Sequence, residues 1–145
     1  MQVDFYHLTQ SPIERVLPRI CERVVEEGGR LLIVAEEPLL GQLDSLLWSY
    51  APTSFLPHGR ADAPRQEAQP ILLSTAPTPT NGADRIALAD GRWRDESLEF
   101  ARCFYFFDAD HLAEARTSWR ALKGREGVET RYWKQGETGQ WVQGP

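Results

Sequence analysis

Several features that would restrict the class of this protein are scarce or missing in its 145 residues. Only two cysteines occur, Cys21 and Cys103, and because both lie in apolar surroundings we expect small core residues and no disulfide. The longest apolar runs, 31–35 and 104–107, are far shorter than the ~18 residues of a membrane span. Residues 1–4 lack the basic start of a signal peptide. A cytoplasmic protein with no membrane partner is the expectation.

Positive charge is also in deficit, because 16 Lys and Arg residues face 21 Asp and Glu residues and the net charge is −5. Proteins that bind bare DNA through its phosphates usually carry a basic excess, so duplex binding is disfavoured. The charge is unevenly spread. Residues 112–134 hold six basic and three acidic residues, a net of +3, which leaves −8 for the rest of the chain. A local basic patch on an acidic body favours a small anionic partner.

Glycine-rich phosphate loops are missing as well. The first expected strand–helix loop, residues 9–11, reads Thr-Gln-Ser and matches neither a dinucleotide fingerprint nor a P-loop. The three histidines have no partner at a metal-ligand spacing. Asp108, Asp110 and His111 cluster before the expected helix at 110–123. Asp108 or Asp110 is interpreted as its cap, with a metal or acid–base site formed by the cluster as the alternative. We expect no cofactor, no metal and no catalytic residue.

What is present indicates one α/β domain over residues 1–145. Helices are expected at 12–27, 38–50 and 110–123. The first has Ser11 as N-cap and Pro12 at its first position, and Pro18 either kinks it or splits it into a first turn and a main helix from 18 to 27. Alternating or apolar segments predict strands at 2–8, 31–35, 71–74, 84–89, 100–107 and 128–135. This order predicts a three-layer, Rossmann-like, mainly parallel sheet without a nucleotide-binding loop. Six of the ten prolines fall in 51–83, so this part should be loop-rich, with 76–83 exposed.

The helix at 110–123 carries the first group of residues with binding potential. Arg116, Trp119, Arg120 and Lys123 are spaced i, i+3, i+4, i+7 and therefore share one face. One interpretation is a solvated charged face whose Trp119 packs into the core. The other is a site where guanidinium groups bind a carboxylate and the indole holds an apolar group.

The second group follows the helix at 38–50. Trp48 lies at the edge of that helix's apolar stripe, and Phe55 lies in the proline-bounded segment that contains Pro57 and His58. These aromatic side chains either pack the loop onto the sheet or form an exposed patch for a protein partner.

With these two groups the sequence resembles the chi subunit family of the bacterial DNA polymerase III holoenzyme. The most specific stretch is Leu43-Asp-x-x-Leu47-Trp48 followed by Ser54-Phe55-x-Pro57-His58. The resemblance also includes Asp4-Phe5-Tyr6 with Leu8, the strand at 29–34, and Arg116-x-x-Trp119-Arg120 with Gly127. It covers nearly the whole chain in order.

The resemblance implies a non-catalytic accessory subunit, associated with the clamp loader, with an α/β fold. Such a subunit binds the acidic, Phe-terminated C-terminal tail of single-stranded DNA-binding protein, and so contacts single-stranded DNA indirectly. Carried over by position, the tail-binding cations are Arg116 and Arg120, assisted by Lys123, and the aromatic partner is Trp119. Tyr105 or Phe106 would form the apolar floor. The psi subunit, or another clamp-loader component, would meet Trp48, Phe55, Pro57 and His58.

Two departures from the family pattern accompany these expectations. Leu112 stands where the family often has a lysine, and the segment 132–141 is more aromatic, which points to a lineage in which psi can be absent. Two other functions remain as alternatives. One is a small nucleotide-dependent α/β enzyme. The other is direct single-stranded DNA binding, with Trp119, Tyr132 and Trp133 stacking on bases.

Overall fold

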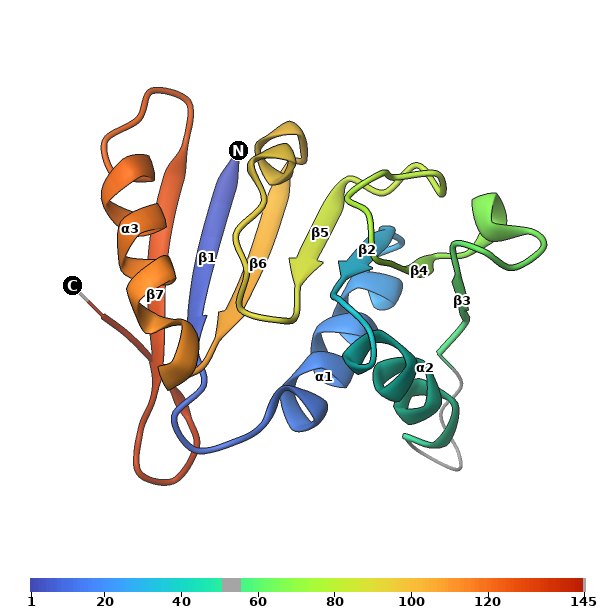
Figure 1. The fold of residues 1–145 in the computed structure, drawn as a ribbon, viewed down its shortest axis with the longest axis horizontal. Coiled ribbons are helices and arrows are strands. Elements are labelled where there is room, and N and C mark those ends of the chain that lie inside the picture. Colours follow the sequence, from blue (N-terminus) through green and yellow to red (C-terminus); the bar gives the residue numbers. More distant parts are fainter. Residues whose placement is uncertain (51–55, 145) are drawn as a thin grey trace.

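The structure is a computed structural model that describes residues 1–50 and 56–144. Within these residues one eight-stranded sheet has the order β3-β4-β2-β5-β6-β1-β7-β8 (Figure 1). Its strands are β1 (Gln2–His7), β2 (Leu31–Val34), β3 (His58–Arg60), β4 (Ile71–Ser74), β5 (Arg85–Leu88), β6 (Arg102–Phe107), β7 (Glu129–Gln135) and β8 (Trp141–Gln143). All neighbours pair in parallel except β7 and β8, which are antiparallel. The predicted Rossmann-like, mainly parallel α/β fold is confirmed.

Helices cover both faces of this sheet, which gives three layers. They are α1 (Ile13–Glu26), α2 (Leu39–Ser49) and α3 (Leu112–Leu122), with short 3-10 turns η1 (Gln66–Ala68), η2 (Asp95–Glu99) and η3 (Ala109–His111). One buried cluster joins α1 and α2 to side chains such as Tyr6 and Phe106, and a second joins α3 to side chains such as Phe5 and Phe107. Figure 1 shows α3 beside β7 at one end of the sheet and α1 with α2 further along it.

The central strands are apolar on both sides because each side meets a helix layer or a buried loop. All four residues of β2 are fully buried. Cys21 and Cys103 are buried and free, as predicted, and they belong to the two different clusters. Burial raises the pKa of the Cys21 thiol to about 12, so it stays protonated and unreactive at neutral pH.

The start of α1 corrects one sequence prediction. Pro12, not Ser11, occupies the N-cap position, and no side chain caps the helix. The Ser11 N–H instead donates to the side chain of Gln135 at the end of β7, and this bond holds the loop before α1. Pro18 neither ends nor splits the helix, which continues to Glu26. The turn that follows uses Gly28 at φ 73°, a left-handed conformation that glycine adopts without strain.

The proline-rich region contains more order than the sequence indicated. The three-residue strand β3 was not predicted; it pairs in parallel with β4 at the sheet edge. The segment 76–83 is not uniformly exposed, since Asn81 is 2% exposed. Its amide group donates hydrogen bonds to the carbonyl oxygens of Gln69 and Leu31, at 2.9 and 3.4 Å. A polar residue can be buried at this position because it satisfies backbone carbonyl groups at the start of β2 and just before β4.

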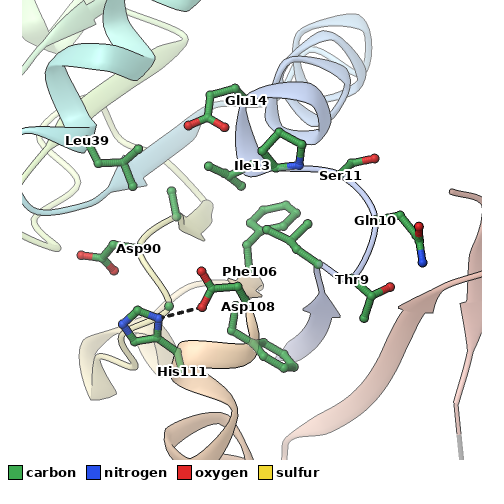
Figure 2. Close-up of a pocket in the computed structure, with 15 residues that line it drawn as sticks. Thr9, Gln10, Ser11, Ile13, Glu14, Leu39, Asp90, Phe106, Asp108 and His111 are labelled. Atoms are coloured by element: carbon green, nitrogen blue, oxygen red, sulfur yellow. Dashed lines mark hydrogen bonds and ion pairs between the residues drawn. The ribbon is translucent and has the colours of Figure 1, made fainter.

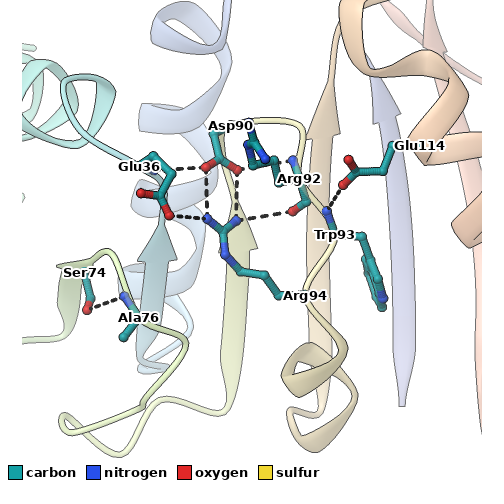
Figure 3. A network of polar contacts seen from close by, with 8 residues as sticks. All are labelled: Glu36, Ser74, Ala76, Asp90, Arg92, Trp93, Arg94 and Glu114. Atoms are coloured by element: carbon teal, nitrogen blue, oxygen red, sulfur yellow. Dashed lines mark hydrogen bonds and ion pairs between the residues drawn. The ribbon is translucent and has the colours of Figure 1, made fainter.

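A polar network closes the turn after β5 (Figure 3). The Arg94 guanidinium donates to both carboxylate oxygens of Asp90, at 2.9 and 3.0 Å, and lies 3.6 Å from Glu36. Asp90 also accepts from the Glu36 N–H at 2.9 Å, so the network ties the end of β5 to the loop after β2. Burial alone would raise the pKa of Asp90, but these hydrogen bonds outweigh it and the pKa lies below its ordinary value.

Candidate functional site

An apolar pocket of about 210 Å³ opens between α3, the end of β6 and the middle of β7. Helix α3 supplies one wall and β7 the other. The residues that line it are Phe107, Leu112, Ala115, Arg116, Trp119 and Tyr132. Five of these six offer carbon surface and one a guanidinium group. The pocket can therefore take an aromatic or aliphatic group that is attached to an anion.

Aromatic contacts fix the shape of this pocket. The Trp119 ring meets Phe5 edge-on at 5.2 Å and Tyr132 edge-on at 5.8 Å, measured between ring centroids. Phe107 packs against Tyr132 at 6.1 Å. Trp119 thus packs into the core with part of its ring and lines the pocket with the rest, so the two interpretations of this residue are not exclusive. Rings held on several sides form a preformed site.

The electrostatic surroundings of the pocket are positive. Arg116 is exposed at the rim, and the Lys123 ammonium lies 5.7 Å from the centroid of the Trp119 ring. Burial lowers the pKa of His7, behind the pocket, and the positive charges of Lys134 and Arg116 lower it further. Within residues 1–50 and 56–144, neither Arg116 nor Lys123 has a carboxylate within ion-pair distance. These cations are available to an anionic ligand.

The other predicted pocket residues are placed differently. Arg120 is exposed on α3 but does not line the pocket. Tyr105 is fully buried, and its hydroxyl donates to the Gly91 carbonyl at 2.8 Å. Phe106 lies in the cluster on the opposite face of the sheet. The floor is therefore Phe107, because successive strand residues point to opposite faces. Sequence reasoning did not place Phe107 and Tyr132 in this pocket. The register that pairs Phe5 with Tyr105, and so brings Phe107 to the same face, is set by strand pairing and not by local sequence.

The second predicted group lies at the other end of the sheet. Trp48 is 64% exposed, and its ring lies 4.6 Å from that of His58. His58 is 5% exposed. Its Nδ1 lies 2.6 Å from the Leu56 carbonyl oxygen, and its Nε2 lies 3.3 Å from Asp44 Oδ1. Pro57 is partly buried beside it, whereas Phe55 lies outside the described residues. His58 thus holds the exposed indole in place.

A larger pocket of about 500 Å³ opens at the carboxyl ends of β1, β5 and β6, where α/β folds of this kind commonly bind nucleotides (Figure 2). The side chains lining it include three carboxylates, Glu14, Asp90 and Asp108, and no lysine or arginine. Asp108 is hydrogen-bonded to His111 and to the Asp110 N–H, at 3.1 and 3.0 Å, as expected of a helix-capping residue. The described part of the chain contains no group of three His, Cys, Asp or Glu residues arranged to hold a metal.

The backbone donors of the β1–α1 loop are already occupied. The N–H groups of Thr9, Gln10 and Ser11 all donate to one oxygen, Oε1 of Gln135, at 3.1, 2.9 and 3.0 Å. These are the groups with which a nucleotide-binding loop would hold a phosphate. An acidic pocket whose loop donors point at an internal amide is unsuited to phosphate.

No helix in the described residues is long and apolar enough to cross a membrane. A search of curated proteins found no match to the chain. A family model described as DNA polymerase III chi subunit, HolC, matches residues 1–130.

Proposed function

The chain belongs to the family of DNA polymerase III chi subunits, and from this membership we propose that it links the replicative polymerase to single-stranded DNA-binding protein. The matched residues include every residue that lines the α3 pocket except Tyr132. The family connects the chain with DNA replication. The pocket at α3 is the single observation that supports a more specific role.

The proposed ligand is the acidic C-terminal tail of single-stranded DNA-binding protein, which ends in phenylalanine. Its terminal ring fits the space between Trp119, Phe107 and Tyr132, and its carboxylates fit the Arg116 guanidinium at the rim. The Lys123 ammonium, over the Trp119 ring, is placed to attract the acidic residues that precede the terminal phenylalanine. Arg120 contributes to the same field from the exposed side of α3.

The proposed contact with the clamp loader is the surface around Trp48. Its exposed indole, packed against His58, is one of two large apolar side chains with high exposure in the described residues. The psi subunit, or another clamp-loader component where psi is absent, is the proposed partner. With both contacts made, the protein would tether the polymerase assembly to coated single strands.

We also propose that the chain has no catalytic activity of its own. A nucleotide-dependent enzyme would need phosphate contacts at the β1–α1 loop, whose donors Gln135 occupies. Location in the cytoplasm follows from the same replication role and is part of this proposal.

The test is a titration of labelled tail peptide into the protein, its Arg116→Ala variant and the control Arg125→Ala, which removes an equal charge from an exposed site outside the pocket. Hydrogen bonds to charged groups contribute about 1.5–3 kcal/mol, so Arg116→Ala should weaken binding roughly ten- to a hundred-fold, and Arg125→Ala by less than about twofold.

A peptide whose terminal phenylalanine is replaced by alanine should bind weakly to all three proteins. Equal tail affinity in Arg116→Ala and Arg125→Ala, with normal circular dichroism, would reject this site. ATP added in place of the peptide should give no binding and no hydrolysis. Reproducible turnover that is lost in Asp108→Ala would favour the enzyme instead.

A further inference from the structure

A second groove, of about 470 Å³, runs between α1 and the β7–β8 hairpin. It lies on the face of the sheet opposite α3, because Tyr6 at its floor belongs to the cluster that packs on α1. Exposed arginines of α1 form one wall, and Trp141 with the hairpin residues Thr138 and Gln140 forms the other. The proposed tail pocket uses none of these residues.

The α1 wall is a regular row of positive charge. Arg15, Arg19 and Arg23 follow one another at intervals of four residues, about 6 Å along the helix. All three are exposed, and none forms an ion pair with a carboxylate in the described parts of the chain. The groove lining contains no Asp or Glu, whereas the pocket at the carboxyl ends of the strands contains three and no Lys or Arg. On a chain of net charge −5, the groove is thus a second basic surface beside the segment 112–134.

The opposite wall offers an aromatic surface and neutral donors. Trp141 is partly exposed and meets Tyr6 edge-on at 5.1 Å, and Tyr6 in turn stacks with Trp133 at 6.4 Å between centroids. The aliphatic residues Val16 and Ile20 are buried beneath, at 9% and 8% exposure. Aliphatic and aromatic side chains therefore form the floor of the groove. The groove offers a flat ring, amide and hydroxyl groups, and a line of guanidinium groups.

We propose that this groove binds single-stranded DNA, with consecutive phosphates on Arg15, Arg19 and Arg23 and a base against Trp141. A row of evenly spaced cations matches a polymer that carries one negative charge per repeat. Stacking on an indole needs an unpaired base, which a single strand supplies and a duplex does not. An acidic peptide fits less well, because its charges do not repeat evenly along the chain and a tail with one terminal phenylalanine offers one ring, whereas every nucleotide of a single strand carries a base.

The groove and the tail pocket lie on opposite faces of β7. Tyr132 points into the tail pocket, and Trp133, the next residue, points to the face that carries the groove. A strand held in the groove would therefore not obstruct a tail peptide at α3. The protein would touch single-stranded DNA directly while it holds the protein that coats the DNA.

The test is fluorescence anisotropy of a labelled oligo-dT, at low salt and over a salt series, with the full chain. Arg15→Ala/Arg23→Ala should weaken binding roughly tenfold, and the slope of log K against log salt should become shallower by about 1.4, the value expected for two lost phosphate contacts. Arg92→Ala/Arg125→Ala removes the same charge from exposed sites outside the groove and should leave both quantities unchanged. Trp141→Phe should keep the fold and weaken oligo-dT binding.

The same proteins are titrated with the acidic tail peptide. Unchanged peptide affinity in Arg15→Ala/Arg23→Ala, together with the loss of oligo-dT binding, supports a separate DNA site even if the tail pocket itself proves wrong. Three results would overturn the proposal. They are the absence of oligo-dT binding at low salt, an equal loss of oligo-dT affinity in the two double variants, and a loss of affinity for the peptide in Arg15→Ala/Arg23→Ala that leaves its affinity for oligo-dT unchanged. The last result would identify the groove as a peptide site.

Discussion

Gln135 illustrates how one side chain determines what a pocket cannot bind. Its Oε1 accepts hydrogen bonds from three consecutive backbone N–H groups of the β1–α1 loop, and its Nε2 lies 3.4 Å from the Gly139 carbonyl oxygen. The residue is 6% exposed, so water does not readily replace it. The loop is thereby fixed to β7 and to the β7–β8 turn.

Gln135→Ala is expected to lower the free energy of unfolding by about 1–3 kcal/mol, because it leaves these donors without their acceptor. Gln135→Glu keeps an acceptor oxygen in place, so its free energy of unfolding should fall by less. Urea unfolding measures both, with the exposed Gln143→Ala as a control expected within about 0.5 kcal/mol of the parent. If Gln143→Ala lowered the free energy of unfolding as much as Gln135→Ala, the role of Gln135 in holding the loop would be contradicted.

Asp90 gives stability a defined pH dependence. Its pKa in the folded protein lies below the ordinary value of 3.8, so its contribution is complete above that pH and is lost as the pH falls through the folded pKa. Asp90→Asn should therefore be less stable than the parent at pH 7, by about 1.5–3 kcal/mol, and the difference should shrink below pH ~3.8. Unfolding at a series of pH values tests this, with exposed Asp84→Asn as the control. A stability difference between the parent and Asp90→Asn that does not change with pH would contradict this role of Asp90.

Among the helices and strands, the sequence predicted best those in which a hydrophobic pattern repeats over many residues. The helical spacing of α1 and α3 and the alternation of β7 predicted those elements to within a few residues, because each face that is buried repeats along the element. Strand β3 has three residues in a proline-rich segment, which is too short for a period. Its place at the sheet edge comes from pairing with β4, a contact that local sequence does not encode.

The residues of the α3 pocket were also predicted only where a local pattern reveals them. The α3 face follows from helical spacing, so Arg116 and Trp119 were found. The floor of the pocket depends on which face of β6 turns toward α3, and that register is set by pairing with β1. Phe107 shares the α3 face with Phe5, whereas Phe106 shares the α1 face with Tyr6.

These neighbouring phenylalanines of β6 provide a matched pair of variants. Phe106→Leu and Phe107→Leu each remove a ring from a buried position and should cost similar stability, about 1 kcal/mol. Only Phe107→Leu changes the α3 pocket, so it alone should weaken tail-peptide binding by several-fold or more. Thermal melts and peptide titration measure the two effects. If both variants weakened peptide binding equally, Phe107 would not be the floor of the binding pocket.

For the whole molecule, charge and topology separate the surfaces. The acidic body carries a basic segment at 112–134, which forms α3 and most of β7. The sheet between α1 and α3 separates the groove from the α3 pocket. The Trp48 surface lies at the far end of the sheet, near β3. The proposed attraction of the tail by exposed charges predicts that its affinity falls as salt is added.

The five tryptophans make a direct test of the central claim possible, because Trp48, Trp119 and Trp141 mark the three surfaces. Two-dimensional ¹H–¹⁵N NMR resolves their indole N–H signals, and a Trp→Phe variant at each position assigns them. On titration with the Phe-terminated tail peptide, we expect the Trp119 signal to move in proportion to occupancy while those of Trp48 and Trp141 stay in place. Movement of the Trp48 or Trp141 signal, with Trp119 unchanged, would contradict tail binding at α3.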